Sequence, residues 1–77
     1  MAQIIKTSPP DVTFLIDEAS GSLTYLGRAK VGSSTSDAVW QIKRIIKQGT
    51  VNSIQFADGD RGFDNIWDNR SSLTYTN

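Results

Sequence analysis

The chain contains neither cysteine nor histidine among its 77 residues. A chain of this length forms one small domain with a limited core, and such domains usually depend on disulfides, metals or association. The missing residue types exclude disulfides, structural zinc, thiolate nucleophiles and the Ser-His-Asp triad. We therefore expect a domain that is supported by partners or by copies of itself, that is not an enzyme and that uses no cofactor.

β-branched residues dominate the composition. Val, Ile and Thr number 4, 8 and 7, whereas the helix formers Ala and Leu number 5 and 4. β-branched side chains favour strands over helices. The proline pair at 9–10 would interrupt a strand, so we divide the chain into an N-terminal arm at 1–10 and a single β domain at 11–77. Ile4 and Ile5 are expected to anchor the arm on a neighbouring subunit.

Alternating apolar and polar residues predict several strands separated by turns rich in Gly and Ser. The first strand carries apolar residues on both faces, which indicates a strand that is covered on both sides. We predict an all-β fold, namely a small antiparallel β-sandwich or barrel of about five strands with one short helical turn. The predicted strands span residues 12–17, 23–31, 38–48, 51–56 and 71–76, and the helical turn spans residues 63–70.

The segment 38–48 also fits an amphipathic helix, with Ser36 as N-cap and Gly49 as the C-terminal stop. We favour a strand because the turn at 48–50 and the alternating run at 51–56 would complete a hairpin. Gly27 inside a predicted strand indicates either a β-bulge or a close backbone approach. The predicted core consists of Phe14, Ile16, Leu23, Tyr25, Trp40, Ile42, Ile54, Phe56, Ile66, Trp67 and Leu73.

The 8 basic and 8 acidic residues give a net charge of zero, which argues against direct binding to nucleic acid. The apolar stretches are too short to cross a membrane, and we expect no membrane partner. Cations predominate in residues 19–57 and acids in residues 58–68. These charges either pair within the chain or form a basic face that meets the acidic loop of a neighbouring molecule.

The acidic loop at 58–64 offers alternate carboxylates around glycines, a spacing that suits calcium. However, the glutamate that closes an EF-hand loop is absent, and Arg61 lies at the centre. An ordinary turn with Asp64 capping the helical turn is the other interpretation. The sequence leaves calcium binding by this loop open.

Three sequence runs resemble a family of small proteins of tailed bacteriophages. They are SDAVWQIKRI, ADGD and FDNIWDNRSSLTY, at residues 36–45, 57–60 and 63–75. The resemblance implies a virion structural protein, such as a head, neck, tail or fibre-associated β domain. It also implies that other virion proteins and copies of the chain are the partners, and it implies no catalytic residues.

Assembly is then expected to use the N-terminal arm and the edges of the sheet. The alternative is a carbohydrate- or receptor-binding module on a phage fibre, which would use exposed Tyr or Trp side chains and the 58–64 loop. The candidate partner-binding residues are Ile4, Ile5, Arg28, Lys43, Arg44, Asp58, Asp60 and Asp64.

Overall fold

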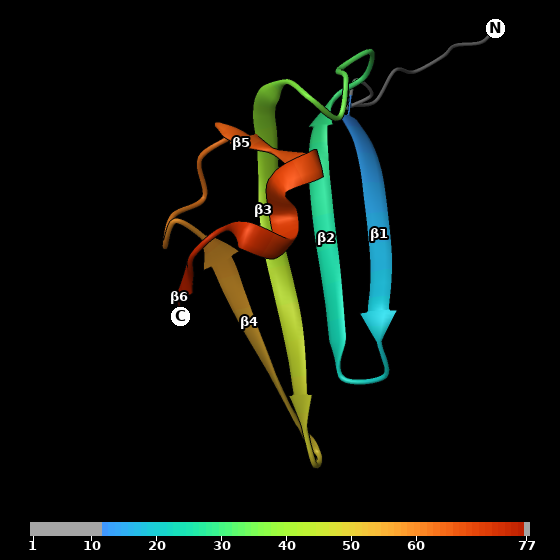
Figure 1. The fold of residues 1–77 in the computed structure, drawn as a ribbon, viewed down its shortest axis with the longest axis vertical. Coiled ribbons are helices and arrows are strands. Elements are labelled where there is room, and N and C mark those ends of the chain that lie inside the picture. The colour runs from blue at the N-terminus through green and yellow to red at the C-terminus, as the bar shows by residue number, and fades with distance from the viewer. Residues whose placement is uncertain (1–11, 77) are drawn as a thin grey trace, which may run out of the picture.

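The computed structural model describes residues 12–76, which form six strands and one short 3-10 helix (Figure 1). The predicted arm, with Ile4 and Ile5, lies outside the described residues. The elements in chain order are β1 (Val12–Ser20), β2 (Leu23–Lys30), β3 (Ala38–Gln48), β4 (Val51–Ala57), β5 (Asn65–Ile66), η1 (Trp67–Ser72) and β6 (Tyr75–Thr76).

The all-β prediction is confirmed, because every strand pair is antiparallel and the helix is short. Residues 38–48 form a strand and pair with β4 across a turn at Gly49 and Thr50. Gly49 has a φ of +63°, a left-handed conformation that glycine adopts without strain. The hairpin argument therefore identified this segment correctly.

The C-terminal segment differs in detail from the prediction. Asn65 and Ile66 first pair with β3, so the helix begins at Trp67 and continues to Ser72. The last strand is correspondingly shorter than predicted and contains only Tyr75 and Thr76. Short pairings of this kind leave little signal in an alternation pattern.

The strands form one sheet in the order β1-β2-β3-β4-β6, and β5 also pairs with β3. β3 is long enough to pair with β5 near its start and with β4 over its second half. A loop connects β4 to β5 and reverses the chain. The C-terminal segment that follows passes across one face of the sheet (Figure 1). The β3–β4 hairpin projects beyond the part that this segment covers.

The core forms where the C-terminal segment lies on the sheet. The indole of Trp67 lies directly on Gly27, where a Cβ atom would come within 2.5 Å of two ring carbons. Both strand registers continue through Gly27, so this glycine marks a close approach rather than a bulge. The buried apolar residues are Tyr25, Ala29, Trp40, Ile42, Ala57, Trp67 and Tyr75.

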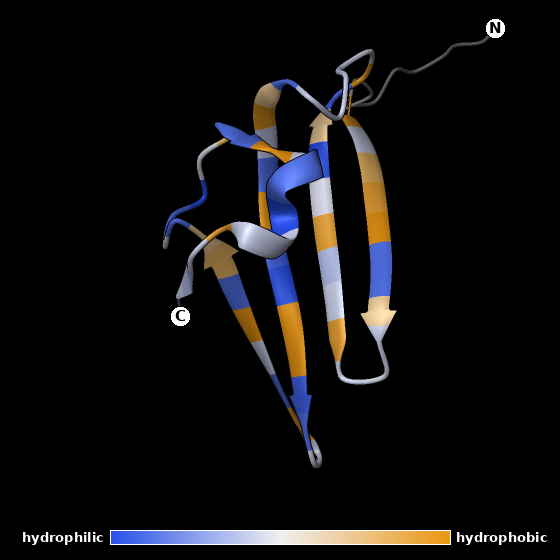
Figure 2. Ribbon diagram, viewed as in Figure 1, coloured by the Kyte–Doolittle hydropathy of each residue, from blue (hydrophilic) through white to orange (hydrophobic). Residues whose placement is uncertain are grey.

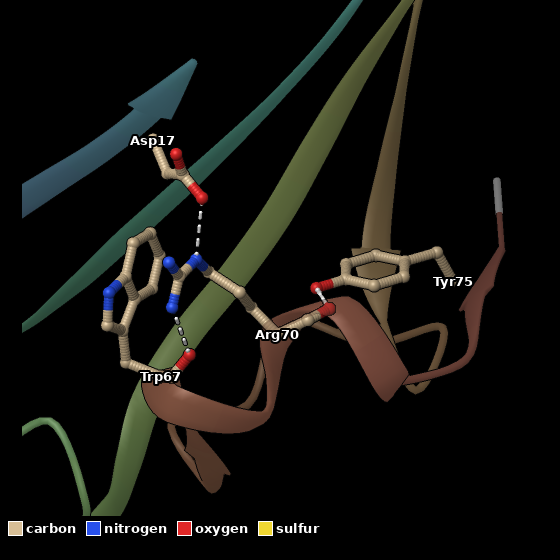
Figure 3. A network of polar contacts seen from close by, with 4 residues as sticks. All are labelled: Asp17, Trp67, Arg70 and Tyr75. Atoms are coloured by element: carbon tan, nitrogen blue, oxygen red, sulfur yellow. Dashed lines mark hydrogen bonds and ion pairs between the residues drawn. The ribbon is translucent and has the colours of Figure 1, made fainter. Parts of the chain in front are cut away.

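A polar network around Arg70 fixes the C-terminal segment, residues 65–76, to the sheet (Figure 3). We call this segment the cover. The Arg70 guanidinium donates to Asp17 Oδ2 at 2.9 Å and to the Trp67 carbonyl at 3.1 Å. The Tyr75 hydroxyl donates to the Arg70 carbonyl at 2.7 Å. The network thus joins β1 to η1 and β6, and Asp17 and Arg70 are 53 residues apart in the sequence.

The core prediction is partly wrong. Phe14, Ile16 and Ile54 are 64%, 66% and 53% exposed, because they lie on the face that the C-terminal segment does not cover. On β1 it is Leu15, opposite Gly27, that packs against the core. Tyr25, Trp40, Ile42 and Trp67 are buried as predicted, whereas Leu23, Phe56, Ile66 and Leu73 are half-buried.

We expect Gly27→Ala to lower the free energy of unfolding by about 1–3 kcal/mol, because the new methyl group would displace the Trp67 ring. Urea unfolding followed by tryptophan fluorescence measures this change. Gly21→Ala is the matched control, since a Cβ at Gly21 meets no atom within 4 Å. Equal stabilities of the two variants would contradict the close packing of Trp67 on Gly27.

We also expect Tyr75 to make stability depend on pH in alkaline solution. Burial, helped by the nearby Tyr25 phenol, raises the pKa of Tyr75 from 10.0 to about 12. The folded state therefore holds this proton more tightly, so stability is complete below pH 10 and falls as the pH rises to about 12. Urea unfolding across this range should give a weaker pH dependence for Tyr75→Phe than for the unchanged chain, and equal slopes would contradict the assignment.

Candidate protein-interaction face

The sheet face opposite the C-terminal segment carries exposed apolar side chains, among them Phe14, Ile16 and Ile54, and we call it the open face. It is the far side in the view of Figure 1. The strand registers place on this face Val12, Phe14, Ile16, Thr24, Leu26, Arg28, Lys30, Gln41, Lys43, Ile45, Lys47, Asn52, Ile54 and Phe56.

Apolar side chains lie side by side in the middle of the open face. Ile16 lies beside Leu26 on the next strand, and Ile45 lies beside Ile54. Lys43 lies between Leu26 and Phe56. Figure 2 shows the apolar block along β1 and the mixture of apolar and polar residues along β3 and β4. A monomer seldom leaves a contiguous apolar patch in water without a function.

A shallow groove crosses this patch between β1 and β3. It holds about 240 Å³ and is lined by Phe14, Ile16 and Leu26, with Arg28, Gln41 and Lys43 at its polar side. Small-molecule sites usually hold roughly 300–1,000 Å³. The groove therefore suits protruding side chains of another protein better than a substrate.

The charge on the open face is mainly positive. Four of the residues that pair in register on this face are cations, namely Arg28, Lys30, Lys43 and Lys47, and none of the residues paired there is an acid. Glu18 follows Ile16 at the end of β1, where the register with β2 is lost. Within residues 12–76 the one ion pair joins Arg70 to Asp17. One interpretation of the sequence expected the cations of residues 19–57 to pair with the acids of residues 58–68, but no ion pair joins these two groups within the described part of the chain.

The cations are held instead by neutral groups. Arg28 Nε donates to Gln41 Oε1 at 2.7 Å, and Gln41 Nε2 donates to the Arg61 carbonyl at 2.8 Å. Lys43 and Arg61 both lie over the Phe56 ring, each 5.6 Å from its centroid. These contacts orient the cations and leave their charge uncompensated, so they favour a partner that carries carboxylates.

The predicted partner-binding residues fall in three places. Arg28 and Lys43 lie on the open face, whereas Arg44 lies on the covered face, over the Tyr75 ring and bonded to Gln55. The acids Asp58, Asp60 and Asp64 are exposed in the loop after β4. The sequence prediction missed Phe14, Ile16 and Ile54 as surface residues, because it placed them in the core. The apolar residues on both faces of β1 were the available signal, since they indicate that a partner covers the second face.

The acidic loop is held by bonds to neighbouring segments, such as that from the Asp58 amide to the Thr74 carbonyl at 2.7 Å, and by one bond within itself. Asp60 Oδ1 accepts from the Gly62 amide at 2.8 Å, and Asp64 Oδ1 accepts from Asn65 Nδ2 at 3.3 Å. Asp64 does not cap η1, because the helix begins three residues later. In the described chain, no three acidic side chains form a group that could hold a metal ion.

The four Tyr and Trp rings are all in the core and are at most 9% exposed. Trp40 packs against Trp67 and Tyr25 against Tyr75, in each case with ring centroids 5.9 Å apart. They are therefore not available to stack against a sugar. No helix within residues 12–76 is long and apolar enough to cross a membrane.

Replacing both Phe14 and Ile16 with Thr should change the free energy of unfolding by less than about 1 kcal/mol, because both side chains are mostly exposed. Ile42→Ala is the comparison and should cost about 2–5 kcal/mol, because Ile42 is 1% exposed. Urea unfolding measures both changes. Binding of the apolar anionic dye anilinonaphthalene sulfonate should fall in the double variant, and a loss of stability as large as that of Ile42→Ala would place Phe14 and Ile16 in the core.

Comparisons of the chain with protein-family models, with curated proteins and with solved structures found no match.

Proposed function

We propose that this chain is a non-enzymatic structural component of a tailed-bacteriophage particle, in its head, neck, tail or fibre, and that another virion protein covers its open face. The resemblance of residues 36–45, 57–60 and 63–75 to small phage proteins supports the virion assignment. The protein would act by contact alone.

The observation that carries the proposal is the open face itself. Burying the exposed parts of Phe14, Ile16 and Ile54 would contribute about 1–2 kcal/mol each. A partner that offers apolar side chains edged with carboxylates would fill the groove and compensate Arg28 and Lys43. Contact surfaces of proteins combine these two features, an apolar centre and a polar rim.

Catalysis has less support than assembly. The loop acids Asp58, Asp60 and Asp64 are exposed, whereas a general acid is usually held in an apolar pocket. The groove on the open face is lined by no acid and no hydroxyl group. The receptor-binding alternative keeps only the acidic loop, since the Tyr and Trp rings that it requires are buried.

Purified particles of the phage that encodes the chain provide the test. Mass spectrometry should detect the protein in them, and Ile54→Lys should reduce its incorporation about tenfold or more, because a cation would enter the apolar centre of the contact. Val51→Lys is the matched control, since Val51 is 61% exposed on the same strand but points to the other side. Absence of the unchanged protein from the particles would overturn the proposal.

A further inference from the structure

Among residues 12–76, β1 is an edge strand of the sheet. It begins the strand order β1-β2-β3-β4-β6, and within the described residues it pairs on one side only, with β2. At the opposite side of the sheet, β6 pairs with β4 and β5 pairs with β3, so that edge is occupied over part of its length. The unpaired backbone groups of the described sheet are therefore concentrated along β1.

The first part of the β1 edge, from Val12 to Ile16, lacks the features that normally prevent edge pairing. Natural edge strands are protected by prolines, charged side chains, bulges or very short length, and in β1 the acids Asp17 and Glu18 lie beyond this part. β1 is 9 residues long and contains no proline and no cation, and its register with β2 is regular from Val12 to Asp17. The one irregularity lies after Asp17.

We infer that β1 pairs with β1 of a second copy, antiparallel, about a two-fold axis at Leu15. This inference deepens the proposed function, because it names the first partner in assembly. In this register Phe14 lies opposite Ile16 of the second copy. The two-fold axis repeats that contact, so four large apolar side chains meet at the centre of a continuous open face.

The charges of β1 select this register over its neighbours. With the axis at Leu15, Asp17 lies opposite Thr13 and Glu18 lies opposite Val12 of the second copy. An axis at Phe14 would pair only residues 12–16 of the described strand. An axis at Ile16 would place two carboxylates, those of Asp17 and Glu18, against the apolar side chains of Leu15 and Phe14. The axis at Leu15 opposes only one carboxylate of each copy to an apolar side chain, and it pairs more of the described strand than the axis at Phe14, so it is the favoured register.

The pairing also closes the assembly. A two-fold contact uses the same edge of both copies, so no β1 edge remains for a third molecule. Packing two open faces against each other is a poorer solution, because it would bring together the four cations of each copy. We therefore assign the β1 edge to a second copy and the open face to a different, acidic partner.

Sedimentation of the full chain over a series of concentrations tests the inference. The unchanged protein should dimerise, and Phe14→Lys or Ile16→Glu should raise the dissociation constant about tenfold or more. The double variant Phe14→Lys/Ile16→Glu should regain most of the affinity, since each new Lys lies opposite a new Glu of the second copy. Both positions are exposed, and circular dichroism verifies that each variant is folded.

The matched control is Phe14→Lys/Ile16→Lys, which changes the same positions but opposes like charges and should stay monomeric. A monomeric unchanged protein would overturn the inference. So would a dimer that the single changes leave intact, or one that Phe14→Lys/Ile16→Glu fails to restore.

Disulfide trapping gives an independent readout, because the chain contains no cysteine of its own. Oxidation of a mixture of Phe14→Cys and Ile16→Cys proteins should yield mainly the mixed dimer, with Ile54→Cys as an exposed control that stays uncrosslinked. A preference for the Phe14→Cys homodimer would overturn the antiparallel register. If the unchanged chain is a monomer but Ile54→Lys still reduces its incorporation into particles, only the β1 pairing is wrong. If the unchanged chain is a dimer but is absent from purified particles, only the virion proposal is wrong.

Discussion

The contact between the Trp67 indole and Gly27 determines which face of the sheet becomes the interior. Any side chain at position 27 would hold the Trp67 ring away from β2. The ring can pack on the strand because glycine has only a hydrogen atom at that position. Trp40, Ile42 and Leu15 then surround the same point. The Arg70 network holds the cover in register with this contact, although its ion pair with Asp17 is half-exposed and contributes little by itself.

Local sequence patterns were sufficient to predict the four long strands and their hairpins, because alternation and glycine turns act between near neighbours. They missed β5 and predicted too long a last strand. They could not identify the interior face of β1, since Phe14 and Leu15 are equally apolar and lie on opposite faces. That choice depends on Trp67, which is distant in sequence. The same limit applies to the candidate interaction residues: Arg28 and Lys43 reach the open face, whereas Arg44 reaches the covered one.

The positive charge of the open face has a related origin. Its cations contact glutamine or aromatic rings rather than carboxylates, as Arg28 and Lys43 illustrate. Neutral partners fix the direction of a cation without cancelling its field. A small chain with zero net charge can thereby present one strongly basic side, and this property depends on the placement of residues rather than on composition.

The position of the cover at the C-terminal end of the described residues has a kinetic consequence. The β1–β2 and β3–β4 hairpins join residues close in sequence and can form early, whereas Arg70 and Asp17 are 53 residues apart and meet late. In the interval, both apolar faces of the four-stranded sheet are in water, and the two indoles are apart. During this interval the chain is most prone to aggregate, so its yield on refolding depends on how fast the cover docks.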